Sequence, residues 1–141
     1  INNKKIDLRN PSHIRPWQYV LDSVNGYIKI AEYLNINDNP YESFNFGPKN
    51  SQKPISVMDI FNKLLNTHGR KIEVSTPKNT LFKESQQINL ISKRANRVLG
   101  WKNKINLDQG LQDTYKWYSI YYDNPNNIIK YSQQKIIEFY S

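Results

Sequence analysis

The sequence predicts an α/β fold that is mostly helical and contains only a few short strands. Three observations support this. Apolar residues recur with the 3.6-residue period of an amphipathic helix in several long segments. Helix-capping residues precede these segments, and helix-ending residues follow them. Between them lie short β-type segments bounded by Pro, Gly and Asn.

The first half of the chain is predicted to alternate short strands with helices. Polar and apolar residues alternate over residues 5–9, as they do in a strand with one buried face. The sequence Asn10-Pro11-Ser12 ends this predicted strand. A helix over 20–34 is predicted by an apolar stripe made of Val20, Val24, Tyr27, Ile28, Ala31 and Leu34. A strand is expected at 43–46. A second helix is expected over 56–65.

The capping signals are clearest in the second helix and in the second half of the chain. Ser56 and Asp59 have the spacing of a capping box, and Gly69 ends that helix. Asn106 with Gln109 is expected to cap a long helix that reaches Tyr122.

The remaining elements of the second half are shorter. Residues 71–75 are strand-like, and residues 78–87 are irregular. A short helix is expected over 93–99, ended by Gly100, and a final helix over 129–140.

The composition predicts a folded chain with a thin core. Its 141 residues fit one domain or less, and Leu, Ile, Val and Phe make up 37 of them. The chain starts with Ile1 and its single Met is Met58, so we expect a fragment or a processed chain. It has no Cys and no long apolar run, and no signal-peptide layout opens the chain. We therefore expect a cytoplasmic protein without a membrane partner.

The net charge of +8 does not by itself predict a nucleic-acid partner. The 15 Lys are scattered, and only Lys93 and Arg94 with Arg97 approach a basic cluster. A nucleic-acid surface needs clustered basic residues with stacking aromatic side chains between them. We expect a solvated basic surface and no nucleic acid.

Catalytic and cofactor signatures are not found in the sequence. The five Gly residues are too far apart for a Gly-x-Gly-x-x-Gly phosphate turn or a Walker loop. Tyr131 and Lys135 match the Tyr-x-x-x-Lys pair of short-chain dehydrogenases, but a chain with 10 Tyr and 15 Lys contains about one such pair by chance. His13 and His68 have no partner at metal-ligand spacing. We expect no catalytic residue, no cofactor-binding residue and no metal site in this chain.

The most informative segment lies between residues 8 and 20. It places Arg15 directly before Pro16, Trp17 and a long helix. A guanidinium group offers a planar donor fork to a phosphate, Pro16 stiffens the backbone, and Trp17 supplies a flat apolar wall. The arrangement suits an anion, but the residues alone favour the simpler interpretation of an exposed arginine and a core tryptophan.

This segment resembles the Arg-Asn-Pro-x-Ala-Ile-Arg-Pro-Trp-Gln-His-Val run of the CDP-glucose 4,6-dehydratases, members of the extended short-chain dehydrogenase/reductase family. Three further segments are similar to the family: Gly26-Tyr27, Phe44-Asn45-Phe46-Gly47-Pro48, and Leu99-Gly100-Trp101 with the helix that follows. Arg-Pro-Trp-Gln indicates the CDP branch. Tyr19 and Ile91 depart from the family pattern.

The resemblance implies the C-terminal portion of a Rossmann enzyme whose N-terminal NAD-binding domain is absent from this chain. The family oxidises glucose C4 with NAD, eliminates water across C5 and C6, and returns the hydride to C6. CDP-glucose thereby becomes CDP-4-keto-6-deoxyglucose, a step of deoxysugar and lipopolysaccharide biosynthesis. The chain alone is expected to be inactive, and the full-length protein is expected to be a homo-oligomer.

The resemblance also implies a set of substrate-binding residues. Arg15 matches the arginine that clamps the diphosphate of CDP-glucose or a similar nucleotide sugar. Leu8, Arg9 and Asn10 match the loop near the base, and Glu84 matches a ribose or phosphate neighbour.

The implied division of the chain is a substrate-binding strand and loop (1–19), a helix and strand that join the Rossmann lobe (20–47), a substrate lobe (48–106) and C-terminal helices (107–141). Without the Rossmann lobe, the apolar stripe of the helix in segment 20–47 should lose the surface against which it packs. The side chains of Phe44 and Phe46 in the same segment should lose their packing partners too. Two alternatives stay open: another nucleotide-sugar dehydratase or epimerase, and a non-catalytic basic binding module.

Overall fold

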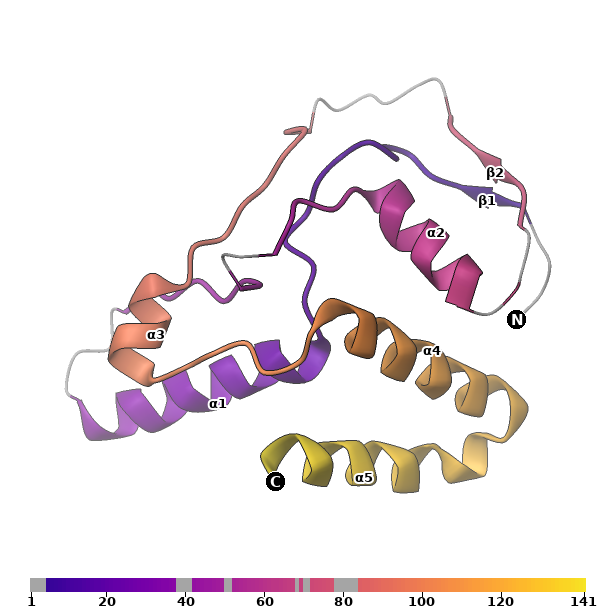
Figure 1. The fold of residues 1–141 in the computed structure, drawn as a ribbon. Coiled ribbons are helices and arrows are strands. Elements are labelled where there is room, and N and C mark those ends of the chain that lie inside the picture. Colours follow the sequence, from indigo (N-terminus) through magenta and orange to yellow (C-terminus); the bar gives the residue numbers. More distant parts are fainter. Residues whose placement is uncertain (1–4, 38–41, 50–51, 68, 70–71, 78–83) are drawn as a thin grey trace.

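The computed structural model describes residues 5–37, 42–49, 52–67, 69, 72–77 and 84–141. Helices dominate, as the sequence predicts, and the strands are short (Figure 1). The predictions that fall on His68 and on residues 38–40, 71 and 78–83 lie outside the described residues.

The sheet joins the start of the chain to its middle. Strand β1 (Ile6–Asp7) pairs in parallel with β2 (Val74–Ser75), with Ile6 opposite Val74. The Leu8 N–H donates to the Ser75 carbonyl at 2.9 Å and extends the pairing by one step. These two strands confirm the predicted β-segments at 5–9 and 71–75, although each is shorter than predicted.

The expected strand at 43–46 is wrong, because residues 42–46 pair with no strand in the described part of the chain. A strand needs a backbone ladder beside it, and this segment lies against the start of a helix instead. The Gly47 N–H donates to Ser92 Oγ at 2.8 Å, and Arg94 Nη1 donates to the Ser43 carbonyl at 3.1 Å.

The predicted helices are all present. They are α1 (Val20–Ile36), α2 (Val57–Thr67), α3 (Lys93–Leu99), α4 (Leu107–Asp123) and α5 (Ile128–Tyr140), with a 3₁₀ turn η1 (Pro125–Asn127) between the last two.

Their ends follow the predicted signals. The Asp59 N–H donates to Ser56 Oγ at 3.1 Å while the Ser56 N–H donates to Asp59 Oδ2 at 3.0 Å, which is a reciprocal capping box. Asn106 Oδ1 caps α4 by accepting from the Gln109 N–H at 2.9 Å. Gly100 ends α3 with φ +63°, a left-handed conformation that glycine adopts without strain.

The elements form an open arrangement (Figure 1). α4 and α5 make an antiparallel hairpin through η1, α3 packs on α1, and α2 lies between the sheet and α4. No helix in the described part of the chain is long and apolar enough to cross a membrane.

A small core lies between α1 and α3. It contains Phe46, Ala95 and Trp101, and the rings of Phe46 and Trp101 are 5.0 Å apart between centroids. Gly26 of α1 permits this packing, because a Cβ at this position would lie 2.8 Å from the Phe46 ring. The expectation that Phe46 loses its partners is therefore wrong, since α3 and Trp101 cover it.

The apolar stripe of α1, in contrast, is open to solvent. Val20, Val24, Tyr27 and Ile28 are 61%, 40%, 66% and 43% exposed. The buried residues of α1 are instead Asp22, Asn25 and Gly26. α1 therefore turns its polar and small residues toward the rest of this chain and presents its apolar stripe outward.

Candidate functional site

The loop between β1 and α1 is fixed on both sides by backbone hydrogen bonds. On the α2 side, the Val57 N–H donates to the His13 carbonyl at 3.0 Å, and the Met58 N–H donates to the Pro11 carbonyl at 2.8 Å. These bonds also satisfy N–H groups in the first turn of α2, which have no partner inside the helix.

On its other side the loop meets the segment that precedes α3. The Ile14 N–H donates to the Gln86 carbonyl at 2.8 Å, and the Ile88 N–H donates to the Ile14 carbonyl at 3.2 Å. Ile14 thus forms bridges to residues far apart in the sequence, Ser56 and Gln87. This pairing brings residues 84–85 beside the side chain of Arg15.

Arg15 is held by four hydrogen bonds. Its Nη1 donates to the carbonyls of Ile14 at 2.9 Å and Ser85 at 3.1 Å. Its Nη2 lies 3.0 Å from His13 Nδ1 and donates to Glu84 Oε2 at 3.0 Å. The side chain is 22% exposed. The guanidinium group therefore has a fixed position at the edge of the loop.

Glu84 brings the predicted site residues together. Its carboxylate pairs with Arg9 and Arg15 and accepts from Asn10 Nδ2 at 3.4 Å. Arg9, Asn10, Arg15 and Glu84, chosen from the sequence, thus form one cluster. Leu8, the fifth predicted residue, is half-buried and continues the β1 pairing through its N–H.

A hollow of about 310 Å³ lies beside Arg15. Lys49 and Lys53 line it together with Arg15, and the described residues that line it include no carboxylate. Pro16, Pro48 and Pro54 supply rigid apolar parts of its wall, and Gln52 and Asn89 supply amide groups. A cationic hollow with apolar walls and a few amides fits a ligand that carries phosphate groups and a flat ring.

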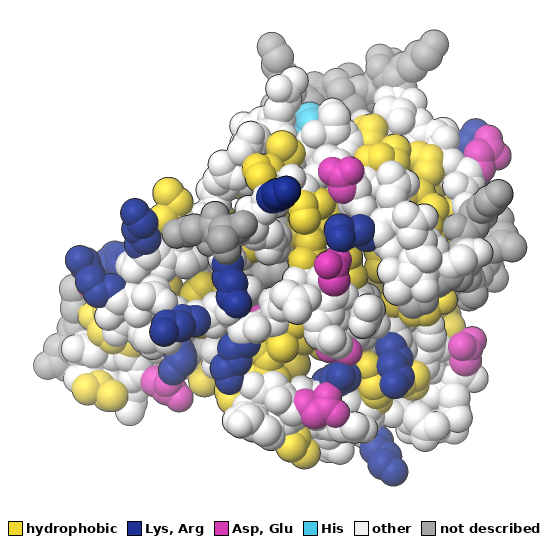
Figure 2. Space-filling model, in the orientation of Figure 1, with side chains coloured by type: hydrophobic (Ala, Val, Ile, Leu, Met, Phe, Trp, Pro, Cys, Tyr) yellow, Lys and Arg dark blue, Asp and Glu magenta, His cyan; other side chains and the backbone are white. Residues whose placement is uncertain are grey.

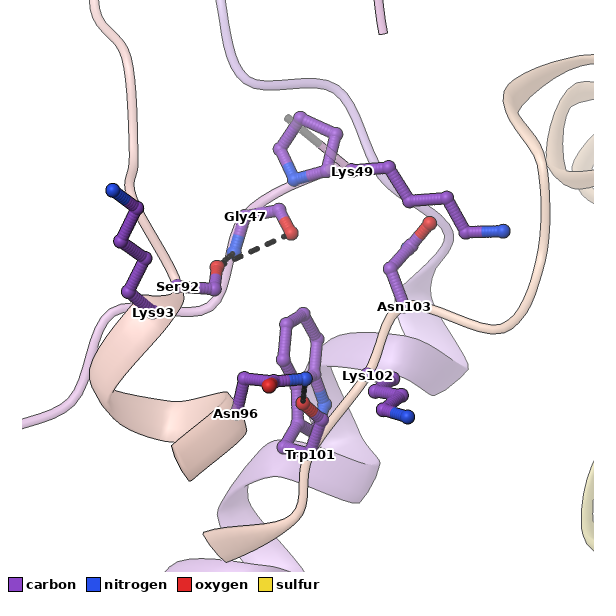
Figure 3. A pocket seen from close by; sticks show the side chains of 9 residues that line it. Gly47, Lys49, Ser92, Lys93, Asn96, Trp101, Lys102 and Asn103 are labelled. Atoms are coloured by element: carbon purple, nitrogen blue, oxygen red, sulfur yellow. Dashed lines mark hydrogen bonds between the residues drawn. The ribbon is translucent and has the colours of Figure 1, made fainter. Parts of the chain in front are cut away.

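A larger hollow of about 660 Å³ adjoins it and shares Pro48 and Lys49 (Figure 3). Lys93 stands on one side of this hollow, and Lys49, Lys102 and Asn103 stand on the other, with the Trp101 ring between the two sides. Lys and Arg side chains gather on the α3 side of the molecule, whereas most Asp and Glu side chains on this face lie elsewhere (Figure 2). The two hollows therefore open in cationic surroundings.

Sequence reasoning missed Lys49, Lys53 and His13 as members of this site. The lysines belong to the loop after Gly47-Pro48, where nothing in the local pattern separates them from the other 13 Lys. His13 was considered only as a metal ligand. In the structure it is a neighbour of Arg15, with its Nδ1 3.9 Å from Glu84 Oε2.

Tyr131 and Lys135 lie on α5, and their contacts favour a structural role. Lys135 Nζ pairs with Asp113 at 3.0 Å and with Glu138 at 2.8 Å, and mainly the hydrogen bond to Glu138 raises the pKa of Lys135. Burial raises the pKa of Tyr131, which disfavours the phenolate that a catalytic tyrosine needs. This environment agrees with the interpretation of the pair as coincidental.

The three tryptophans are held by packing or by hydrogen bonds within the chain. Trp101 is 1% exposed and lies in the core. The Trp17 indole N–H donates to the Ile55 carbonyl at 3.1 Å, and that of Trp117 donates to Ser132 Oγ at 2.9 Å. Trp117 also stacks on Tyr121, with the ring planes 8° apart.

No protein-family model matches the chain. A search of curated proteins finds a CDP-glucose 4,6-dehydratase from Salmonella typhimurium that is 29% identical over 141 residues, which is 99% of this chain and 39% of that protein. The resemblance found in the sequence is thus confirmed. The chain spans about two fifths of the length of this curated relative.

Solved structures share the fold. A UDP-glucuronic acid 4-epimerase from Bacillus cereus in complex with NAD superposes with a TM-score of 0.63 and 19% identity over 84% of this chain and 34% of that one. A UDP-glucose 4-epimerase from Thermotoga maritima, with UDP-glucose, gives a TM-score of 0.57 and 19% identity over 78% of this chain and 33% of that one. The fold is therefore shared with part of these nucleotide-sugar epimerase structures, and the mostly helical architecture with a few short strands is as the sequence predicts.

Proposed function

We propose that this chain is the nucleotide-sugar-binding portion of a CDP-glucose 4,6-dehydratase. The observation that carries the proposal is the cluster of Arg9, Asn10, Arg15 and Glu84 beside a cationic hollow. Residues distant in the sequence meet there, and the resemblance had assigned them to one substrate site. The identity to a curated CDP-glucose 4,6-dehydratase over 99% of this chain supports the same substrate class.

In this proposal the chain binds and orients the nucleotide diphosphate of the substrate. Arg15 faces the diphosphate, and Lys49 and Lys53 add positive charge along the same hollow. The loop of Leu8, Arg9 and Asn10 lies near the base, and the Arg9 guanidinium group reaches from this loop to the diphosphate, because Arg9 and Arg15 share the carboxylate of Glu84. Two arginines and two lysines suit the charge of a diphosphate, because charge-assisted hydrogen bonds are the strongest polar contacts available.

The residues of this chain do not fit an NAD site, because the 141 residues contain no Gly-rich phosphate turn. The hydride and proton transfers of a dehydratase therefore belong to a second, NAD-binding domain of the complete protein. The division into segments 1–19, 20–47, 48–106 and 107–141 is part of the proposal. In this division, segment 20–47 supplies a helix and an extended stretch of chain that lie next to the NAD-binding domain.

The test is binding and turnover of nucleotide sugars by the complete protein. CDP-glucose should bind at least about tenfold more tightly than UDP-glucose, a difference of about 1.4 kcal/mol, measured by calorimetry. CDP-4-keto-6-deoxyglucose should form with NAD present, detected by mass spectrometry as loss of water. A C4 epimer of the same mass as the substrate would favour an epimerase instead, and no binding of either nucleotide sugar would favour a basic binding module.

A further inference from the structure

The carboxylate of Glu84 occupies positions on Arg9 and Arg15 that a ligand anion would take. It pairs with both guanidinium groups and accepts from Asn10 Nδ2 at 3.4 Å, and the Arg15 Nη2 bond is 3.0 Å long. Two guanidinium groups and an amide are a donor set suited to phosphate oxygens. Here a side chain of the protein satisfies this donor set.

Arg15 has little hydrogen-bonding capacity left while Glu84 is in place. An arginine has five N–H donors, four of them on the terminal nitrogens. Those four face the Ile14 and Ser85 carbonyls, His13 Nδ1 and Glu84 Oε2, and the Nε–H makes none of these bonds. A ligand phosphate that is to receive a two-pronged contact from Arg15 must therefore replace one of these four partners.

Glu84 is also the contact of Arg15 that can leave at the smallest cost. The two carbonyls belong to backbone that is fixed by the Ile14 bridges, whereas the Glu84 side chain is 32% exposed and lies outside helices and strands. An ion pair with this much solvent contact contributes only a modest free energy. Its two oxygens can regain hydrogen bonds from water when the side chain turns outward.

We propose that Glu84 is an internal counter-ion that competes with the ligand's diphosphate for Arg9 and Arg15. Glu84 leaves the two guanidinium groups when the diphosphate binds, and it pairs with them again when the nucleotide departs. The inference rests on the proposed function, in which this site holds a nucleotide diphosphate. It gives Glu84 the role of limiting affinity, so that substrate and product, which carry the same diphosphate, both exchange readily.

The role differs from that of a residue that touches the ligand. A carboxylate that binds the ribose hydroxyls strengthens the binding of every nucleotide, including uncharged cytidine. A competing carboxylate weakens only ligands whose anion reaches the two arginines. Removing the charge of Glu84 should therefore change the affinities for CDP and for cytidine differently.

The experiment compares CDP, inorganic pyrophosphate and cytidine as probes on the complete protein by calorimetry, with dissociation followed by stopped flow. Glu84→Gln removes the charge and keeps the shape. We expect it to bind CDP and pyrophosphate about three- to tenfold more tightly, with most of the change in the dissociation rate, and to bind cytidine as the wild type does. Normal cytidine binding also shows that the variant is folded.

Two matched variants complete the design. Glu84→Asp keeps the charge. Its affinity for CDP should lie within about twofold of the wild-type affinity, or between the affinities of the wild type and Glu84→Gln. Glu32→Gln removes an exposed carboxylate from α1, outside the residues that line the hollow, and should leave all three affinities unchanged. An equal gain in affinity for CDP and pyrophosphate in Glu32→Gln would show that the overall charge, not competition at Arg15, causes the tighter binding.

The outcomes separate this inference from the proposed function. Weaker or unchanged binding of CDP in Glu84→Gln, with wild-type binding intact, overturns the counter-ion role and leaves the function standing. Weaker cytidine binding in the same variant assigns Glu84 to the ribose instead. A wild-type protein that binds neither CDP nor pyrophosphate removes the proposed function itself.

Discussion

The carboxylate of Asp22, fully buried in α1, accepts a hydrogen bond of 2.7 Å from the backbone N–H of Lys104. The same carboxylate accepts from Asn103 Nδ2 at 2.8 Å and from the Ile105 N–H at 3.2 Å. The Trp101 indole N–H donates to the Asp22 carbonyl at 2.9 Å. One aspartate thus ties α1 to the whole segment between α3 and α4.

We predict that Asp22→Ala strongly destabilises the protein. The substitution leaves three buried or half-buried donors without an acceptor, and each such donor costs about 1–3 kcal/mol. The free energy of unfolding, measured by urea denaturation with tryptophan fluorescence, should fall by about 3 kcal/mol or more. Glu32→Ala, on the exposed side of the same helix, should change it by less than about 0.5 kcal/mol.

The pH dependence of stability should carry a signature of Asp22. Burial raises its pKa above the ordinary 3.8, although the N–H groups of Lys104 and Ile105 oppose the rise. Between 3.8 and the raised value, the native state binds more protons at this group than the unfolded chain does. The contribution of Asp22 to stability therefore falls as the pH rises through this window.

The comparison with Asp22→Asn tests this sign. Asparagine does not titrate, so the difference in unfolding free energy between wild type and variant isolates the contribution of Asp22. That difference should shrink as the pH is raised from about 3 to about 6. A difference that grows over the same range would show that the native pKa lies below the unfolded one.

Arg15 gives the most direct test of the candidate site. Arg15→Ala in the complete protein removes charge-assisted hydrogen bonds of about 1.5–3 kcal/mol, so the affinity for CDP-glucose should fall roughly ten- to 150-fold. Cytidine should bind almost as before. Arg97→Ala, an exposed arginine on α3 that does not line either hollow, serves as the matched control. Equal weakening of cytidine and CDP-glucose would place Arg15 away from the diphosphate.

Catalysis should require more than this chain. The Gly-rich turn is missing from the 141 residues, and Lys135 is held by Asp113 and Glu138. We therefore expect the 141-residue chain neither to bind NAD nor to dehydrate CDP-glucose. NAD titration by calorimetry and a water-loss assay would check this. Turnover that Tyr131→Phe abolishes would contradict it.

Local signals made the helices predictable, whereas the charged cluster was predictable only through a resemblance. Ser56, Asn106 and Gly100 act within a few residues of their own positions, so the sequence displays the caps directly. Arg15 and Glu84 were found through a resemblance, because pairing between residues 69 positions apart leaves no local pattern. Asp22 was missed for the same reason: its partners lie on a loop more than 80 residues away.

The strand at 43–46 failed because its sequence has β-type residues but the described chain gives it no neighbouring strand. Phe46 packs on Gly26 and Trp101 instead, and only the full tertiary arrangement shows this. The sequence likewise indicated that α1 has an apolar stripe, but not which way it faces. The structure shows that this stripe points away from the rest of the chain.

The exposed stripe of α1 leads to the last prediction. Val20, Val24, Tyr27 and Ile28 are each at least 40% exposed on one helix. Contiguous apolar patches larger than a few hundred Å² are uncommon on monomers, and at about 25 cal/mol per Å² covering a patch of roughly 400 Å² is worth on the order of 10 kcal/mol. We therefore expect the isolated chain either to self-associate through this stripe or to be only partly ordered in residues 20–36.

Hydrogen exchange with mass spectrometry distinguishes these states, together with the mass in solution from sedimentation. Amides of α1 should exchange quickly in a monomeric sample and slowly in an associated one, because packing of the apolar face supplies most of a helix's stability. Val24→Ser with Ile28→Ser should shift the sample toward the monomer, whereas Lys29→Ser, directly after Ile28 on the chain, should not. Slow exchange throughout α1 in a demonstrated monomer would show that buried Asp22, Asn25 and Gly26 hold the helix without any cover on its apolar side.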